Sequence, residues 1–92
     1  MSELLNLEEL LMKVTELEGW EIVDGKLRKV FKFGEYLEGI VFAGHCGKIA
    51  ENMNHHPDLL IQWRKVTVSI STHSAGGLTA LDLAFAGKVE GL

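Results

Sequence analysis

The sequence contains little of what disulfides, membrane spans and nucleic-acid surfaces require. Among its 92 residues there is one cysteine, which excludes an internal disulfide and fits a reducing compartment. The longest apolar runs are far too short to span a membrane, and the acidic, amphipathic N-terminus lacks the features of a signal peptide. The nine basic residues are scattered and the net charge is −4, which argues against direct contact with nucleic acid. We therefore expect a soluble cytoplasmic protein.

The length of the chain favours one small domain, extending over residues 1–92. Hydrophobic residues make up 47% of the sequence, which is more than a single small domain can easily bury. Self-association would cover the excess apolar surface, so we expect an oligomer built partly on helices.

The spacing of apolar residues predicts three helices and four strands. Asp24-Gly25 is typical of a tight hairpin turn between the first two strands. The expected order is helix 6–18, strand 20–23, strand 26–33, helix 34–54, strand 59–63, strand 65–72 and helix 80–89. Two hairpin-like pairs separated by a helix predict an α+β domain, in which three helices pack on one face of a four-stranded antiparallel sheet.

Three glycines lie inside the long predicted helix, at Gly39, Gly44 and Gly47. Each costs roughly 1 kcal/mol of helix stability relative to alanine. Their spacing suggests that a sheet or another helix approaches closely, which would offset the cost.

The residues best suited to chemistry are three histidines at the ends of predicted elements. The only proline, Pro57, disfavours helical conformation in the residue before it, so a helix that reaches Asn54 should stop around His55 and His56. His73 ends a later strand. Because histidine titrates near neutral pH, such a group can both donate and accept protons. The simpler alternative for His55 and His56 is a helix end with two solvated imidazoles.

Two neighbouring features also allow two interpretations. Glu51 precedes His55 by four residues and should share its helix face, where the carboxylate could orient the imidazole or bind a polar heterocycle. It could equally be a solvated surface glutamate. Residues 74–77, Ser-Ala-Gly-Gly, form either an ordinary strand-to-helix loop or a permissive backbone beside a ligand.

A metal centre and a cysteine nucleophile are weaker interpretations. The residues of suitable type are His45, Cys46, Glu51, His55, His56 and His73. His45 and Cys46 are neighbours in the predicted helix and should point about 100° apart, and the sequence has no CxxC or HExxH spacing. Cys46 lies in an apolar stretch, where it is better interpreted as a core residue. We therefore expect no metal.

Several motifs resemble those of one known family. They are Glu51-Asn52-Met53-Asn54-His55-His56-Pro57, Trp63 with Val66, Ser71-Thr72-His73, and Gly77-Leu78-Thr79 with Asp82. Gly19-Trp20 and the phenylalanine-rich second strand extend the similarity over nearly the whole chain. In these features the sequence resembles the pterin-4a-carbinolamine dehydratases, also known as dimerisation cofactors of a homeodomain transcription factor.

The resemblance implies a fold, an activity and an assembly. The family fold is α+β with a four-stranded antiparallel sheet and three helices on one side, assembled as a homodimer or homotetramer. The implied enzyme is a hydro-lyase that dehydrates 4a-hydroxytetrahydropterin to quinonoid dihydropterin, so that aromatic amino acid hydroxylases can reuse their tetrahydrobiopterin-type cofactor. The pterin is the substrate, and neither a cofactor nor a metal is implied.

The resemblance also implies roles for individual residues. His55 and His73 match acid–base histidines, and His56 matches a histidine concerned with holding the substrate. The positions that match residues around the pterin are Glu51, Asn54, Ser71 and Thr72. The alternative is a non-catalytic oligomerisation or binding module for another protein, but the intact set of three histidines favours the enzyme.

Overall fold

The computed structural model describes residues 3–92, which form three α-helices, four strands and one short 3-10 turn. In chain order these are α1 (Leu7–Thr15), β1 (Glu21–Val23), β2 (Lys26–Lys32), α2 (Tyr36–Met53), β3 (Asp58–Gln62), β4 (Lys65–Ile70), the turn η1 (His73–Ala75) and α3 (Ala80–Glu90). None of the helices within residues 3–92 combines the length and the apolar composition needed to cross a membrane.

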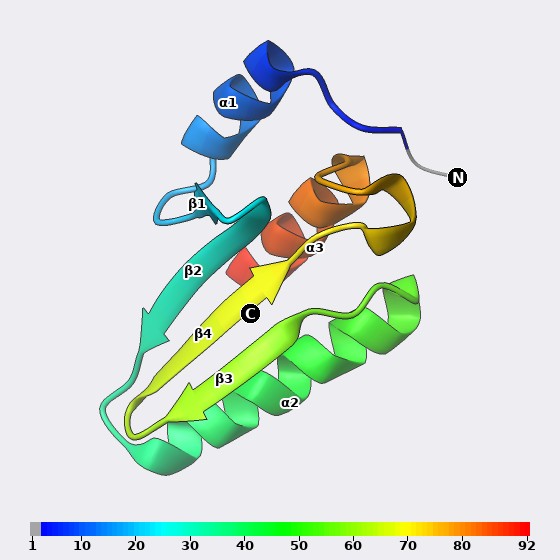
Figure 1. The fold of residues 1–92 in the computed structure, drawn as a ribbon. Coiled ribbons are helices and arrows are strands. Elements are labelled where there is room, and N and C mark those ends of the chain that lie inside the picture. Colours follow the sequence, from blue (N-terminus) through cyan, green and yellow to red (C-terminus); the bar gives the residue numbers. More distant parts are fainter. Residues whose placement is uncertain (1–2) are drawn as a thin grey trace.

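The four strands form one antiparallel sheet in the order β1-β2-β4-β3 (Figure 1). Asp24 and Gly25 have φ values of 51° and 75°, as expected for the type I′ turn that their sequence predicts between β1 and β2. Arg64 has a φ of 61° in the second hairpin, between β3 and β4. The predicted order of elements and the predicted α+β architecture are therefore confirmed.

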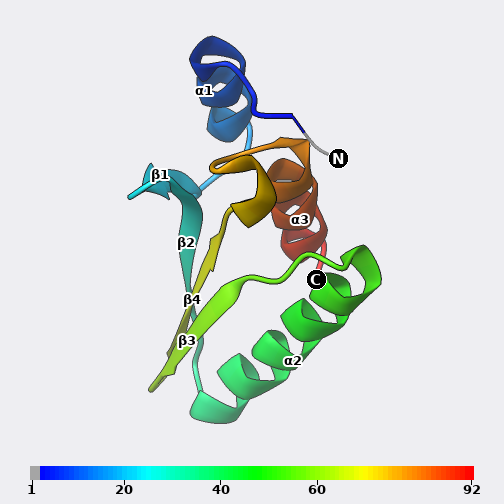
Figure 2. The same ribbon diagram turned by 45° about the vertical axis from the view of Figure 1, so that its right-hand side comes forward.

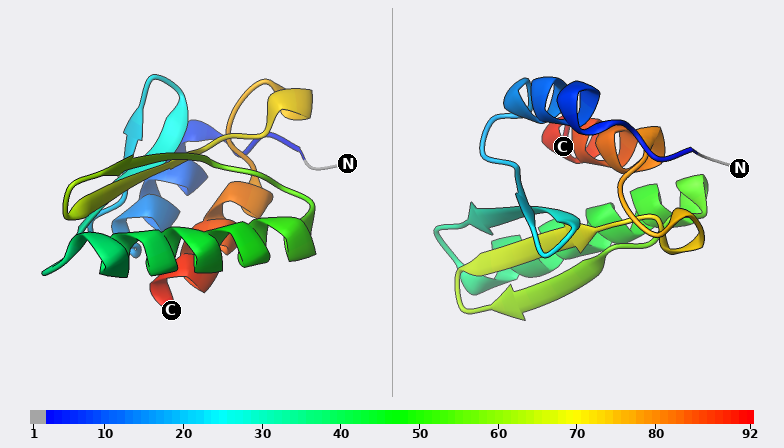
Figure 3. Two further views of the ribbon diagram at one scale, coloured as in Figure 1. Left: turned by 90° about the horizontal axis from the view of Figure 1, so that it is seen from below. Right: turned by 45° about the horizontal axis from the view of Figure 1, so that its top comes forward.

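Alternate residues of the two central strands make the inner face of the sheet. Val66, Val68 and Ile70 of β4 are buried, as their strict alternation predicted. Leu27 of β2 lies opposite Ile70 and is also buried, and Phe85 of α3 belongs to the same apolar cluster. Helices α2 and α3 cover this face of the sheet, and α1 lies on the same side (Figures 2 and 3).

The glycines of α2 do not all serve the same purpose. A Cβ atom at Gly39 would lie 3.2 Å from Val66 Cγ2 and 3.4 Å from the Phe33 ring, so the predicted close approach to the sheet is found at this position. Gly44 and Gly47 would meet nothing within 4 Å. These two glycines leave the outer side of α2 smooth, and the close approach of another helix there stays a prediction.

Replacing Leu27 with alanine should lower the free energy of unfolding by about 2–5 kcal/mol, because the side chain is removed from a fully buried position. The same replacement at Leu7, which is 69% exposed on α1, should change it by less than about 0.5 kcal/mol. Urea denaturation followed by circular dichroism measures both values. Equal losses at the two positions would contradict this location of the core.

Candidate active site

The site begins where α2 ends. The helix stops at Met53, and Asn54 caps it in the left-handed conformation with a φ of 50°. The His55 N–H then donates to the Ala50 carbonyl at 3.0 Å, a bond that reaches back five residues, as is typical of a left-handed helix end. The predicted stop is confirmed, and it directs the chain away from the helix at the first histidine.

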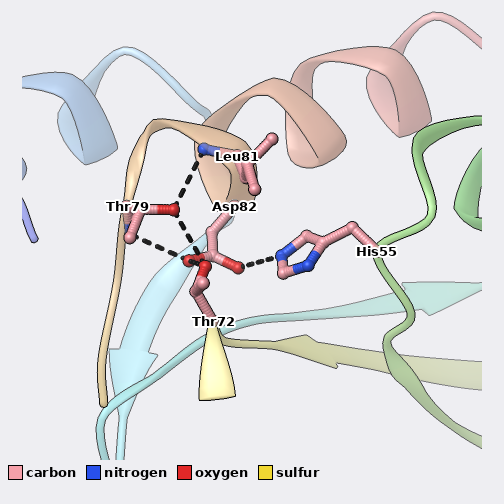
Figure 4. A network of polar contacts seen from close by, with 5 residues as sticks. All are labelled: His55, Thr72, Thr79, Leu81 and Asp82. Atoms are coloured by element: carbon pink, nitrogen blue, oxygen red, sulfur yellow. Dashed lines mark hydrogen bonds and ion pairs between the residues drawn. The ribbon is translucent and has the colours of Figure 1, made fainter. Parts of the chain in front are cut away.

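His55 turns into the protein and meets a buried carboxylate. Its Nε2 lies 2.7 Å from Asp82 Oδ1 at the start of α3, and the His55 side chain is only 11% exposed (Figure 4). Asp82 itself has no exposed surface. The second oxygen, Oδ2, accepts the Thr79 N–H at 2.9 Å in a capping box that begins α3.

Thr72, just beyond β4, completes this network. Its hydroxyl donates to Asp82 Oδ2 at 2.8 Å and also lies 2.8 Å from the Thr79 hydroxyl. Its N–H donates to the Gly77 carbonyl, and its own carbonyl accepts the N–H groups of Ala75 and Gly76. Thr72, which the resemblance places around the pterin, is buried, and its hydroxyl is bonded to the carboxylate that holds His55.

Sequence reasoning missed the link between Asp82 and His55. The spacing Thr79-x-x-Asp82 indicates a capping box at the start of a helix, which accounts for Asp82 without any contact to a histidine. The contact itself joins residues that are 27 positions apart in different elements, and no local pattern signals it.

Glu51 pairs with the other histidine. Its Oε2 lies 2.5 Å from His56 Nε2, and both side chains are largely exposed. The expectation that Glu51 would orient His55 on one helix face is therefore wrong. The left-handed residue Asn54 ends the helical spacing before His55 is reached, so that His55 turns inward and His56 remains on the surface.

The turn that follows β4 lies at the same end of the domain as the end of α2 (Figures 1 and 3), and His73 is the first residue of this turn, η1. It is exposed, and it directly follows Thr72, which joins the Asp82 network. A cavity of about 330 Å³ is lined by Ser71, Thr72 and His73, by the β1–β2 turn residues Asp24, Gly25 and Lys26, and by Gly76 and Gly77. The Ser-Ala-Gly-Gly segment thus contributes backbone to a hollow beside His73.

The remaining predicted residues lie farther along α2. Glu51 lines an open groove of about 470 Å³ with Gly44, Gly47, Lys48 and Asn52. Asn54 is exposed at the helix cap. The predicted binding residues are thus divided between a hollow beside His73 and a surface groove on α2.

Cys46 is a core residue, as its apolar surroundings predicted. Burial raises the pKa of its thiol to about 11, so the thiol stays protonated at neutral pH and is a poor nucleophile. The adjacent His45 is exposed. In the part of the chain that the structure describes, no three side chains of His, Cys, Asp or Glu are arranged to hold a metal ion.

The geometry provides two imidazoles with different surroundings. His55 is held by a buried carboxylate, whereas His73 is exposed beside a polar hollow. A pair of this kind can deliver a proton at one point of a bound molecule and remove a proton at another.

Comparison with known proteins finds relatives that are similar over nearly the whole chain. A candidate pterin-4-alpha-carbinolamine dehydratase of Roseiflexus castenholzii is 40% identical over 90 residues, covering 98% of this chain and 97% of the relative. One from Sulfolobus acidocaldarius is 39% identical over 86 residues, or 94% of each chain.

A solved structure from Brucella melitensis, described as a transcriptional coactivator/pterin dehydratase, matches with a TM-score of 0.89 and 30% identity over 95% of each chain. A pterin dehydratase-like protein identified as a RuBisCO assembly factor of the alpha-carboxysome shares the fold, with a TM-score of 0.63 and 22% identity over 78% of this chain and 83% of its own. The model of the pterin 4 alpha carbinolamine dehydratase family matches residues 3–92, and the chain belongs to that family.

Proposed function

We propose that this protein dehydrates a 4a-hydroxytetrahydropterin to the quinonoid dihydropterin and water, and so returns an oxidised pterin to the tetrahydropterin cycle. The observation that carries the proposal is the buried contact between His55 and Asp82, which lies next to the turn that bears His73. Membership of the dehydratase family supports the choice of substrate.

The reaction needs two proton transfers and no change in oxidation state. The C4a–O bond breaks as a proton reaches the departing hydroxyl, and the N5–H bond gives up its proton while its electrons form the C4a=N5 bond. In our proposal His55 and His73 share these two transfers as acid and base, each contributing typically 10²–10⁴-fold. His56, paired with Glu51 at the surface, holds the substrate.

The pterin ring presents an amide and a guanidine-like edge that require polar partners. We propose that Glu51, Asn54 and Ser71 provide them, since these residues are not sealed in the core. Thr72 contributes through Asp82, because its buried hydroxyl is bonded to that carboxylate.

Replacing His55 or His73 with alanine should chiefly lower kcat, because a proton-transfer group acts in the transition state. Replacing His56 should chiefly raise KM. The double variant His55→Ala/His73→Ala should lose nearly all activity. Stopped-flow measurement of 4a-hydroxytetrahydropterin decay, with circular dichroism as a folding control, tests all four proteins, and a double variant with most of the wild-type kcat would refute histidine catalysis.

We expect activity to be independent of metal, because the proposed chemistry consists of proton transfers that imidazoles can perform. Dialysis against a strong chelator should leave kcat unchanged, and the metal content of the active protein should be far below one ion per chain. A rate that is lost on chelation and restored by zinc would contradict this expectation.

We further propose that the protein forms a homodimer or homotetramer through the first half of α2. This segment exposes four large apolar side chains on successive turns: Tyr36, Leu37, Ile40 and Val41. Leu37 and Val41, one turn apart, are 68% and 59% exposed. The smooth surface at Gly44 and Gly47 continues this face and would let a second helix approach.

Leu37→Glu should shift the protein to a smaller species in light scattering at micromolar concentration, since a buried unpaired charge opposes association. Met12→Glu, at an exposed position of α1, serves as the matched control and should leave the assembly unchanged. A monomeric wild-type protein would refute the oligomer, and dissociation by the Met12 variant alone would place the interface on α1.

A second candidate function is that of a binding module for another protein. The description of the Brucella relative as a transcriptional coactivator as well as a dehydratase motivates it, and so does the exposed apolar face of α2. The decay assay separates the two functions. A folded wild-type protein that fails to accelerate 4a-hydroxytetrahydropterin decay would leave the binding module as the better proposal.

A further inference from the structure

Behind His55 lies a chain of buried hydroxyl groups. The Thr79 hydroxyl lies 2.8 Å from the Thr72 hydroxyl, which lies 2.8 Å from Asp82 Oδ2 (Figure 4). Asp82 Oδ1 faces His55 Nε2 at 2.7 Å. Thr72, Thr79 and Asp82 are all buried, so water cannot accept the hydrogens of the two hydroxyls. These hydrogens therefore need acceptors inside the protein.

Counting hydrogens shows which group donates and which accepts at each hydrogen bond between these hydroxyls and Asp82. The N–H of Leu81 donates to the Thr79 hydroxyl oxygen, and the N–H of Thr79 donates to Asp82 Oδ2. If Asp82 is ionised, the Thr72 hydroxyl donates to Oδ2, the Thr79 hydroxyl donates to Thr72, and every hydrogen has an acceptor. The carboxylate then receives three donors, an arrangement that stabilises its charge.

A protonated Asp82 fits less well. A proton on Oδ2 would have to point at the Thr72 oxygen, and the Thr72 hydroxyl would then donate to Thr79. Among residues 3–92 the only oxygen hydrogen-bonded to the Thr79 hydroxyl is that of Thr72, so the hydrogen of the Thr79 hydroxyl would be left without an acceptor in the interior. A proton on Oδ1 would pass to His55, since imidazole binds a proton more tightly than a carboxylate does.

Because an ionised Asp82 can only accept a hydrogen bond, it determines the tautomer of His55. Nε2 keeps its hydrogen, which it donates to Asp82, in both the neutral and the charged imidazole. Nδ1 is then the atom that gains and loses a proton. We propose that Thr72 and Thr79 are positioning residues whose hydroxyls hold Asp82 ionised, so that His55 presents Nδ1 to the substrate as its proton-exchanging atom.

The inference rests on the proposed dehydratase function, because it assigns the atom through which His55 would exchange the proton of that reaction. It also makes a claim about the free protein that requires no turnover. The tautomer of a neutral histidine is observable by long-range ¹H–¹⁵N NMR, and the loss of one signal in His55→Gln identifies the resonances of His55.

Thr72→Val is the central variant, because valine keeps the branched shape and removes the hydroxyl. Neutral His55 should carry its hydrogen on Nε2 in the wild type and become a mixture of tautomers in Thr72→Val. In the same variant kcat should fall about tenfold, the effect of losing one hydrogen bond to a charged group, while KM stays close to the wild-type value. Thr72→Ser, which restores the hydroxyl, should recover both properties.

Thr67→Val provides the matched control. Thr67 is a buried threonine on β4 that takes no part in the chain, so the same change of side chain should alter neither the tautomer nor kcat. Wild-type His55 with its hydrogen on Nδ1 would overturn the proposal, as would a Thr72→Val variant identical to Thr67→Val in both measurements. A wild type with the expected tautomer but no dehydratase activity would support the hydroxyl chain and refute the proposed function instead.

Discussion

The carboxylate of Asp82 lies in the interior without exposed surface, and a charge in that position is tolerated only if donors surround it. The donors come from three separate segments: His55 after α2, Thr72 after β4, and the Thr79 backbone at the start of α3. One buried group thus holds together the ends of three elements. The proposed acid–base histidine is held both by this contact and by the backbone bond to the end of α2.

The residues around this contact fall into a buried group and an exposed group. His55 and Thr72 face the buried carboxylate, whereas His56, Glu51 and His73 remain at the surface, where a ligand can reach them. The sheet and α3 therefore provide a rigid background, and the ends of α2 and β4 carry the groups that can meet a substrate. An arrangement of this kind fixes one imidazole in advance and so reduces the entropy that must be lost when a substrate binds.

Local patterns in the sequence were sufficient for most of the fold. The alternation in β4 predicted its buried face, Asp24-Gly25 predicted the first hairpin turn, and Pro57 predicted the end of α2 within two or three residues. Each of these features depends on backbone preference or on which side of an element is apolar. Such preferences act between residues close in the chain, so they can be recognised without knowing the tertiary structure.

The sequence by itself determined the elements and their order, and it placed His55, His56 and His73 at the ends of elements. Only the tertiary structure decided the partners: Asp82 for His55 and Glu51 for His56, with Thr72 turned inward. The prediction that paired Glu51 with His55 assumed helical spacing, which the left-handed conformation of Asn54 interrupts. The physical reason is that a buried carboxylate is stabilised by the donors that lie close to it in space. The fold brings such donors together from distant positions in the sequence, as it does for His55 and Asp82.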